Sequence, residues 1–380
     1  MATAQAYKGA GMSDSTPAMP RHVLIKALNR ALLGRFLLCG AVLVSLLEIL
    51  ALLEKTTPIL NRHLGFRGIL TFAFLHLPAL SIDILPLAFM VGALFLLTQM
   101  TLSSEISALR AAGLSTPALY RLLLPAVLIA GIGGTCAQYW LVPACENALT
   151  TWWNRTDPLA GQDGQPEDNI LWFRAGPTLV RIGQIAQGGT FLRDVTIYHR
   201  DNTGLLTGTE HTNVLTYRDG QWHPDGAQDL SLSDDKSYVN VTKGDSTFVI
   251  PATPSVIMTL SQNGATVTPA QVSAILHKGA PASLPRATYR MALFSGMILP
   301  VEIAVMLLLT LPVIYIPPRA GLRNPLPVYV LAAGMGFVIL QGMISALGNA
   351  GTLPAPLAVS VGPLLGTLLG LTWLLRMEER

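Results

Sequence analysis

Charged side chains are scarce in this sequence of 380 residues. Only 12% of the residues are charged, against about 25% in an ordinary soluble domain, and 51% are hydrophobic. Four long segments contain a single acidic residue between them, Glu48. These segments are residues 36–53, 84–104, 122–145 and 326–375. This pattern excludes an ordinary soluble protein and predicts membrane-spanning helices. The formal net charge of +3 gives no support for nucleic acid binding.

The patterns of common catalytic and metal sites are also missing. No Gly-Lys dipeptide occurs, which excludes a phosphate-binding loop of the Walker type, and no Gly-x-Ser-x-Gly motif is present. The seven histidines include no pair four residues apart and have no cysteine at zinc-binding spacing. We therefore expect a protein that is not an enzyme and that binds no metal or other cofactor itself. Any work that it performs must draw on a partner chain or an ion gradient.

Cysteine is rare as well. Cys39 and Cys136 fall inside apolar runs and Cys145 lies at the end of one, while the polar segment of residues 150–270 has none. The sequence therefore predicts no disulfide framework, even though we place this segment outside the cytoplasm.

Six apolar runs have the length and composition of membrane spans. They are residues 36–53, 82–102, 118–142, 291–315, 326–347 and 355–375. Basic residues from Arg21 to Arg35 precede the first run and place the N-terminus in the cytoplasm, so that six crossings return the C-terminus there. The first run is long and ends in Glu54-Lys55, which favours a retained helix over a cleaved signal peptide. Residues 1–20 are predicted to be a disordered tail.

A shorter apolar stretch follows the first span. Residues 66–77 are too few to cross a membrane, and Pro78 is expected to end the helix that they form. We interpret this stretch as an interfacial helix on the outer side.

The segment of residues 150–270 has the composition of a β domain. Short runs with strand residues recur every ten to twenty positions, and Asp219-Gly220 between two such runs is a hairpin signal. The expected strands include residues 171–174, 178–182, 194–200, 214–217, 237–241 and 247–250, and residues 214–217 lead into the turn segment of residues 218–222. We predict a sandwich or jelly roll. The fold class is thus an α+β membrane protein, in which residues 21–149 and 271–380 each form three transmembrane helices around an extracytoplasmic jelly-roll-like domain.

The cytoplasmic segment of residues 103–115 is predicted to be a short amphipathic helix. Ser103 or Ser104 can cap it, Glu105 lies in its first turn, and Gly113 ends it. Ile106 and Leu109 form an apolar stripe at helical spacing. Such a helix suits docking into a groove on a soluble partner, although most loops of this kind are plain connectors.

Ionisable residues at membrane depth are the other candidates for function. Glu48 and Glu302 are predicted in the outer halves of the first and fourth spans, where each could line a path for a polar substrate or serve structure alone. Asp83 at the mouth of the second span is a weaker candidate. Gln341 is interpreted as a helix–helix hydrogen-bonding group.

A group of basic residues lies on the outer side, against the usual positive-inside distribution. An anionic headgroup would gain charge-assisted hydrogen bonds there, and anchoring to anionic lipids is the alternative. The group comprises Lys55, Arg62 and Arg67 after the first span, with Arg286 and Arg290 before the fourth.

Several local patterns resemble one family. They are Ser-Glu-Ile-Ser-Ala-Leu-Arg-Ala-Ala-Gly at 104–113, Trp-Leu-Val-Pro at 140–143, Leu-Trp at 171–172, Val-Arg-Ile at 180–182, Val-Thr-Ile-Tyr at 195–198, Pro-Pro-Arg at 317–319 and Trp-Leu-Leu-Arg at 373–376. With three spans on each side of a β insert, the chain resembles the LptF/LptG lipopolysaccharide export permeases, and the LptG branch more closely. Ala51 stands where family members can carry a lysine for substrate phosphates.

This resemblance implies a bacterial inner-membrane subunit that extracts lipopolysaccharide and passes it to a periplasmic bridge of β-jelly-roll proteins. The implied partners are an LptF-like permease, an LptB-like ATPase dimer that binds the ATP, and LptC-like and LptA-like periplasmic proteins. The segment at 103–115 would be the coupling helix, and its residues for the ATPase would be Ser104, Glu105, Leu109, Arg110 and Gly113. A gradient-driven secondary lipid transporter, or a non-transporting assembly protein with a periplasmic sensor domain, are the alternatives.

Overall fold

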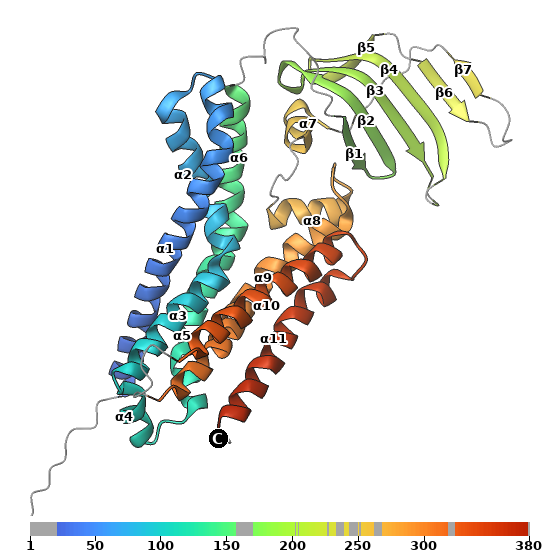
Figure 1. The fold of residues 1–380 in the computed structure, drawn as a ribbon. Helices are drawn as coiled ribbons and strands as arrows, with labels where there is room; N and C mark the ends of the chain where they lie inside the picture. Colours follow the sequence, from blue (N-terminus) through green and yellow to red (C-terminus); the bar gives the residue numbers. More distant parts are fainter. Residues whose placement is uncertain are drawn as a thin grey trace, which may run out of the picture.

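The chain forms two groups of long helices and one β sheet, as seen in a computed structural model (Figure 1). The structure describes residues 21–156, 170–201, 203, 205–225, 228–232, 239–242, 250, 252–261, 268–317 and 324–378. The predicted tail of residues 1–20 and most of the strand expected at 247–250 lie outside these ranges.

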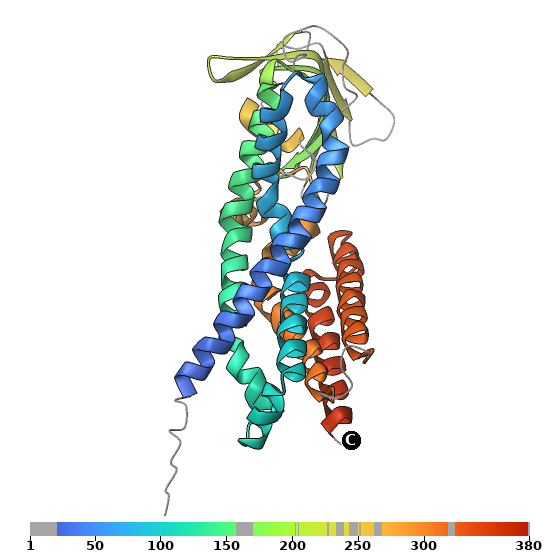
Figure 2. The ribbon, with the colours of Figure 1, turned by 60° about the vertical axis from the view of Figure 1, so that its left-hand side comes forward.

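The first helical half is built around one very long helix, α1 (Arg21–Asn61). With 41 residues, α1 is about 61 Å long, twice the thickness of the hydrocarbon core of a bilayer, about 30 Å. Figures 1 and 2 show α2 and α6 beside its upper part, and α3 and α5 beside its lower part. The bounds of these other elements are α2 Gly65–Asp83, α3 Leu85–Leu102, α4 Glu105–Ala111, α5 Thr116–Cys136, η1 Ala137–Leu141 and α6 Val142–Arg155.

The prediction for residues 66–77 was wrong in extent. Pro78 does not end this helix but lies inside α2, which continues to Asp83, and Ile84 alone separates α2 from α3. A proline in an apolar helix is tolerated when neighbouring groups take up the freed hydrogen-bonding capacity. Seven helices in the described residues are long and apolar enough to cross a membrane, α2 included, so the count of six spans stays a prediction.

The second helical half consists of α9 (Arg286–Thr310), the 3-10 segment η3 (Leu311–Tyr315), α10 (Leu326–Asn349) and α11 (Ala355–Glu378). Helix α9 is central, since it packs against α3 and α5 of the first half and against α10 and α11 of its own. Its residues Val305 to Leu309 are all buried. The two halves therefore share one apolar core.

Glycines let the helices of this core approach closely, as is common in membranes. A Cβ atom on Gly92 of α3 would lie 2.7 Å from the backbone N and Cα atoms of Phe36 in α1, and one on Gly131 of α5 would lie 2.6 Å from Cα of Pro300 in α9. At these two positions the contact is between backbones, so no side-chain rearrangement could make room for a methyl group.

Asn29 joins α1 to α5 through an unusual pair of hydrogen bonds. Its Nδ2 donates to the carbonyl oxygen of Leu122 at 2.8 Å, and its Oδ1 accepts from the N–H of Ala126 at 2.7 Å. The side chain thus bridges two backbone groups that a regular helix would join to each other, next to Pro125 inside α5. Next to the proline, two backbone groups of α5 are therefore bonded by a side chain of the neighbouring helix.

The polar segment forms an antiparallel sheet of seven strands in the order β1-β2-β3-β4-β6-β7, with β5 also paired to β4. The strands are β1 Leu171–Ala175, β2 Thr178–Ala186, β3 Phe191–Arg200, β4 Leu206–Arg218, β5 Gln221–Asp225, β6 Gln228–Leu232 and β7 Val239–Thr242. Asp219 and Gly220 connect β4 to β5 with φ of 50° and 81°. Two positive φ values are typical of a type I′ turn, so the hairpin prediction is confirmed.

One face of this sheet is apolar and is covered by the short helix α7 (Pro254–Ser261). Val180, Ile182 and Val195 are fully buried there against Ile257 of α7. Leu179 alternates with Val180 along β2 and pairs with Tyr198 of β3. The described residues contain this one sheet, and the jelly roll remains a prediction.

The sheet is attached to the second helical half. Arg174 of β1 and Ala282, just before α9, exchange two backbone hydrogen bonds of 2.8 and 2.9 Å. Helix α8 (Pro269–Lys278) comes just before Ala282 in the chain and starts with a capping box formed by Thr268 and Gln271. The edge strand β1 is therefore paired at Arg174 through this isolated bridge.

Close packing of α1 on α3 can be tested at Gly92. Replacing Gly92 with Ala should lower thermal stability in detergent, because a methyl group would push α3 away from the Phe36 backbone, at a cost of about 1–3 kcal/mol. Gly133→Ala in α5 is the matched control, since a Cβ atom there meets nothing within 4 Å and alanine favours the helix. Equal melting temperatures for the two variants would contradict the close contact.

Candidate coupling and transport sites

Helix α4 confirms part of the predicted cytoplasmic helix. Glu105 lies in its first turn, and Gly113 follows its end with φ of 87°, a conformation that glycine adopts without strain. The predicted serine cap was wrong. Ser104 is in the N-cap position, but its φ is 61° and its side chain accepts no capping hydrogen bond, while Ser103 Oγ donates to Glu105 Oε1 at 2.9 Å.

The apolar stripe of α4 faces the chain's own core. Ile106 is buried, and Leu109 is half-buried against the same cluster. Glu105, Ala108 and Arg110 are exposed on α4. A soluble partner would therefore meet a surface of small and charged side chains, while the apolar stripe fixes α4 to the membrane helices.

A three-residue contact joins α4 to the segment η3, which follows α9. The guanidinium carbon of Arg110 lies 4.3 Å from the ring centroid of Tyr315, a distance for a cation–π interaction. The hydroxyl of Tyr315 is 3.0 Å from Thr116 Oγ1 at the start of α5. The pairing of Tyr315 with Thr116 cannot be predicted from sequence, because nearly 200 residues separate them.

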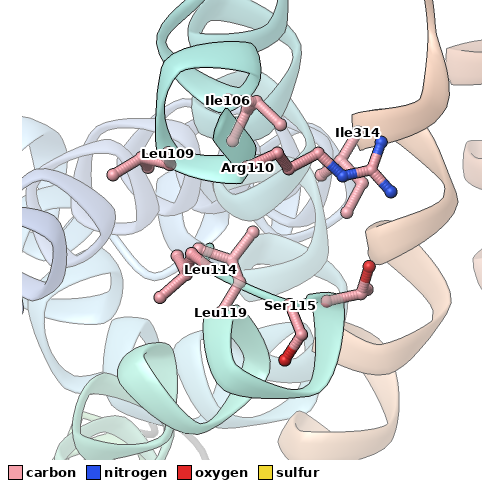
Figure 3. A pocket seen from close by; sticks show the side chains of 8 residues that line it. Ile106, Leu109, Arg110, Leu114, Ser115, Leu119 and Ile314 are labelled. Carbon is pink, nitrogen blue, oxygen red and sulfur yellow. The ribbon is translucent and has the colours of Figure 1, made fainter. Parts of the chain in front are cut away.

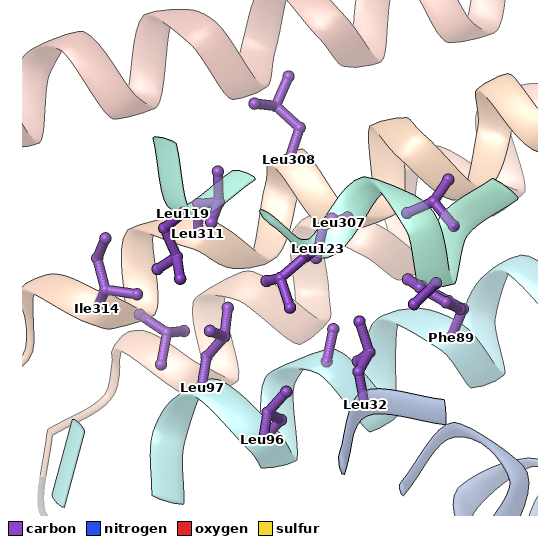
Figure 4. Close-up of a cluster of buried hydrophobic side chains, with 14 of the residues drawn as sticks. Leu32, Phe89, Leu96, Leu97, Leu119, Leu123, Leu307, Leu308, Leu311 and Ile314 are labelled. Atoms are coloured by element: carbon purple, nitrogen blue, oxygen red, sulfur yellow. The ribbon is translucent and has the colours of Figure 1, made fainter. Parts of the chain in front are cut away.

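The apolar part of this contact is continuous with the membrane core. Leu119, Leu311 and Ile314 belong to the same buried cluster as Leu97 and Leu307 (Figure 4). The ends of α3, α5 and α9 that lie next to α4 are thus held as one packed unit.

A second candidate site is a cavity of about 330 Å³ between the start of α3 and helices α9, α10 and α11. Asp83, Gln138, Ser295, Glu302 and Gln341 bring polar groups to its wall, together with apolar side chains such as Met306 and Phe337. Gln341 Nε2 donates to Glu302 Oε1 at 3.1 Å, which confirms Gln341 as a group that links two helices. A partly apolar cavity with a few polar groups is typical of a ligand site.

Glu48 lies elsewhere, between α1 and α2. Its side chain is 9% exposed, and its Oε2 is 3.2 Å from Nδ1 of His76. The ring of His76 stacks on Phe72 at 5.2 Å between centroids. The partner of Glu48 is thus a histidine 28 positions away in the sequence.

The outer basic residues do not form one cluster. Lys55 pairs with Glu54 at 3.0 Å, and Arg67 is exposed on α2. Arg62 is used for structure, since its Nη1 donates to the carbonyl oxygen of Trp153 at 2.6 Å and its guanidinium stacks on that indole ring at 3.9 Å. These contacts tie the α1–α2 hairpin to α6.

The remaining two basic residues lie at the junction with the sheet. Arg286 and Arg290 are exposed at the start of α9. Burial, and then the nearby positive charges of Arg286 and Arg200, lower the pKa of Arg174 in β1. A concentration of positive charge therefore lies where the sheet meets the second helical half, and Arg174 and Arg200 were missed because they are far from Arg286 in the sequence.

A protein-family model described as "Lipopolysaccharide export system permease LptF/LptG" matches residues 26–376. This match covers nearly the whole chain, including both helical halves and the sheet. A search among curated proteins found no match to the sequence.

The structural use of Arg62 gives a testable contrast with Arg67. Arg62→Gln should lower the thermal stability of the purified protein by about 1–2 kcal/mol, because it removes a cation–π contact and a hydrogen bond to Trp153. Arg67→Gln removes the same charge from an exposed position and should leave stability unchanged. Thermal unfolding in detergent, followed by tryptophan fluorescence, measures both, and equal losses would refute the assignment.

Proposed function

The chain belongs to the LptF/LptG family of lipopolysaccharide export permeases, and we propose that it is the membrane-spanning subunit of an ABC-type lipopolysaccharide exporter. In this role it extracts the lipid from the inner membrane of a Gram-negative bacterium and passes it to a periplasmic bridge. The observation that carries the proposal is the family match over both helical halves and the sheet. The LptG branch is our assignment within the family.

Energy comes from a separate ATPase dimer of the LptB kind. The sequence has no phosphate-binding loop of its own, and α4 offers Glu105 and Arg110 on an exposed surface at the end of the helices that is opposite the sheet (Figure 1). An acidic residue in the first turn is favoured by the helix dipole and leaves its carboxylate available to a basic partner. Both termini are then cytoplasmic.

The lipid path begins between the two helical halves. Acyl chains require apolar walls, and an anionic headgroup requires hydrogen-bond donors and cations. The cavity beside Glu302 combines apolar side chains with Gln138, Ser295 and Gln341. Above it, Arg286 and Arg290 lie close to the sheet and are suited to a phosphorylated headgroup.

The sheet lies on the outer side of the membrane and transfers the lipid to the periplasmic bridge. Its attachment through Ala282 keeps the edge strand β1 close to the start of α9. An LptF-like permease completes the transport pathway as the second half of a heterodimer, and LptC-like and LptA-like jelly-roll proteins continue the bridge.

Docking of α4 can be tested with Glu105→Ala in the complex purified from native membranes. Loss of a charge-assisted contact should reduce ATP-dependent lipopolysaccharide release about tenfold and weaken retention of the ATPase subunit. Glu54→Ala removes an exposed acid at the far end of α1 and should change neither quantity. Wild-type assembly, ATP turnover and lipid release in Glu105→Ala would refute the coupling role.

The proposed path can be tested with photo-crosslinking residues at positions 55, 67, 286 and 290. Adducts with lipopolysaccharide at positions 286 and 290 should increase with ATP, because lipid passes there during export. Leu375, exposed near the cytoplasmic end of α11, is the control position and should give none. If no outer position gives an adduct, or if ATP makes no difference, the basic residues only anchor the protein in the bilayer.

The same preparations discriminate the alternatives from sequence. A gradient-driven transporter would move lipid without a co-purifying ATPase and would respond to a proton ionophore. A non-transporting assembly protein would retain periplasmic partners but release no lipid with ATP.

A further inference from the structure

Tyr315 contacts both ends of the short segment that connects α4 to α5. Arg110, in the last turn of α4, stacks on its ring, and Thr116, the first residue of α5, lies within hydrogen-bonding distance of its hydroxyl. Thr116 is 4% exposed, so the hydroxyl pair is shielded from water. A single side chain of the second helical half, that of Tyr315, thus contacts both ends of the turn between α4 and α5 in the first helical half.

The surrounding space is almost filled. The remaining cavity between Ile106, Leu109, Leu114 and Ile314 is about 10 Å³, no more than a single water molecule occupies (Figure 3). Because packed interiors are nearly incompressible, α4 cannot shift toward α9 without moving the residues that it touches.

Tyr315 is also the last residue of the segment η3, in which Val313 and Ile314 are buried in the core. This segment continues α9, the helix that carries Glu302 and Met306 to the wall of the polar cavity. A 3-10 turn is common at the end of an α-helix, and the buried residues of η3 fix this one in the packed core. Here it lies between the contact with α4 and the transport cavity.

We propose that Tyr315 is the positioning residue through which movement of α4 reaches α9 and the cavity. The inference deepens the proposed function and rests on it. A partner that draws α4 outward or presses it inward acts on Tyr315 through Arg110 and Thr116, and η3 passes the displacement to α9. The ring provides the contact with Arg110 and the hydroxyl provides the contact with α5.

The test compares three variants in the intact complex with its ATPase, reconstituted in vesicles loaded with lipopolysaccharide. Tyr315→Leu removes both contacts and should lower the lipid released per ATP hydrolysed about fivefold. Tyr315→Phe and Thr116→Val each remove the hydroxyl pair and should lower the ratio about threefold. Tyr329→Phe, an exposed tyrosine on α10, is the matched control and should leave the ratio unchanged.

Combining Tyr315→Phe with Thr116→Val should give no further loss, because both changes remove the same hydrogen bond. A structural role alone would lower yield or thermal stability and would reduce ATP turnover and lipid release in parallel, with the ratio unchanged. That result, or a wild-type ratio in all variants, would overturn the inference while leaving the proposed function intact. A wild-type complex that hydrolyses ATP but releases no lipid would overturn the proposed function instead.

Discussion

Satisfying polar groups without water is the constraint on which the helical part of this structure depends. Inside a bilayer every backbone N–H and C=O must find a partner in the protein. Asn29 satisfies two backbone groups of α5 next to Pro125. The hydroxyls of Thr101 and Thr310 donate hydrogen bonds to carbonyl oxygens of their own helices. Because these groups are satisfied, α1, α3, α5 and α9 pack as one core.

Three side-chain atoms among the described residues are exceptions to this rule. Glu48 Oε1, Thr98 Oγ1 and Gln341 Oε1 are buried without a hydrogen-bond partner, and the first and third belong to the candidate residues for transport. Gln341 shares the polar cavity with Glu302, and Glu48 keeps a free oxygen beside its contact with His76. Unused hydrogen-bonding capacity at membrane depth is costly, so its retention at these places favours a polar substrate or water during transport.

Most of the architecture was accessible from sequence because apolar runs, charge and turn residues act locally. The hairpin at Asp219-Gly220 and the helix end at Gly113 follow from backbone conformations that glycine favours. The extent of α2 was not accessible, since Pro78 is a strong local stop signal that tertiary contacts override.

The candidate site was predicted only in part. Glu105 and Glu302 were identified by residue type and position, whereas the partners Tyr315, Thr116 and His76 come from distant segments that only folding brings together.

The length of α1 has a mechanical consequence. A helix of about 61 Å whose lower part packs against α3 and α5 behaves as a lever arm. A tilt of about 10° at its N-terminal end would carry its upper tip, with the attached α2 and α6, through about 10 Å. Such a displacement is as large as the diameter of a helix, so a small rotation among packed leucines could open or close a passage wide enough for an acyl chain beside the sheet.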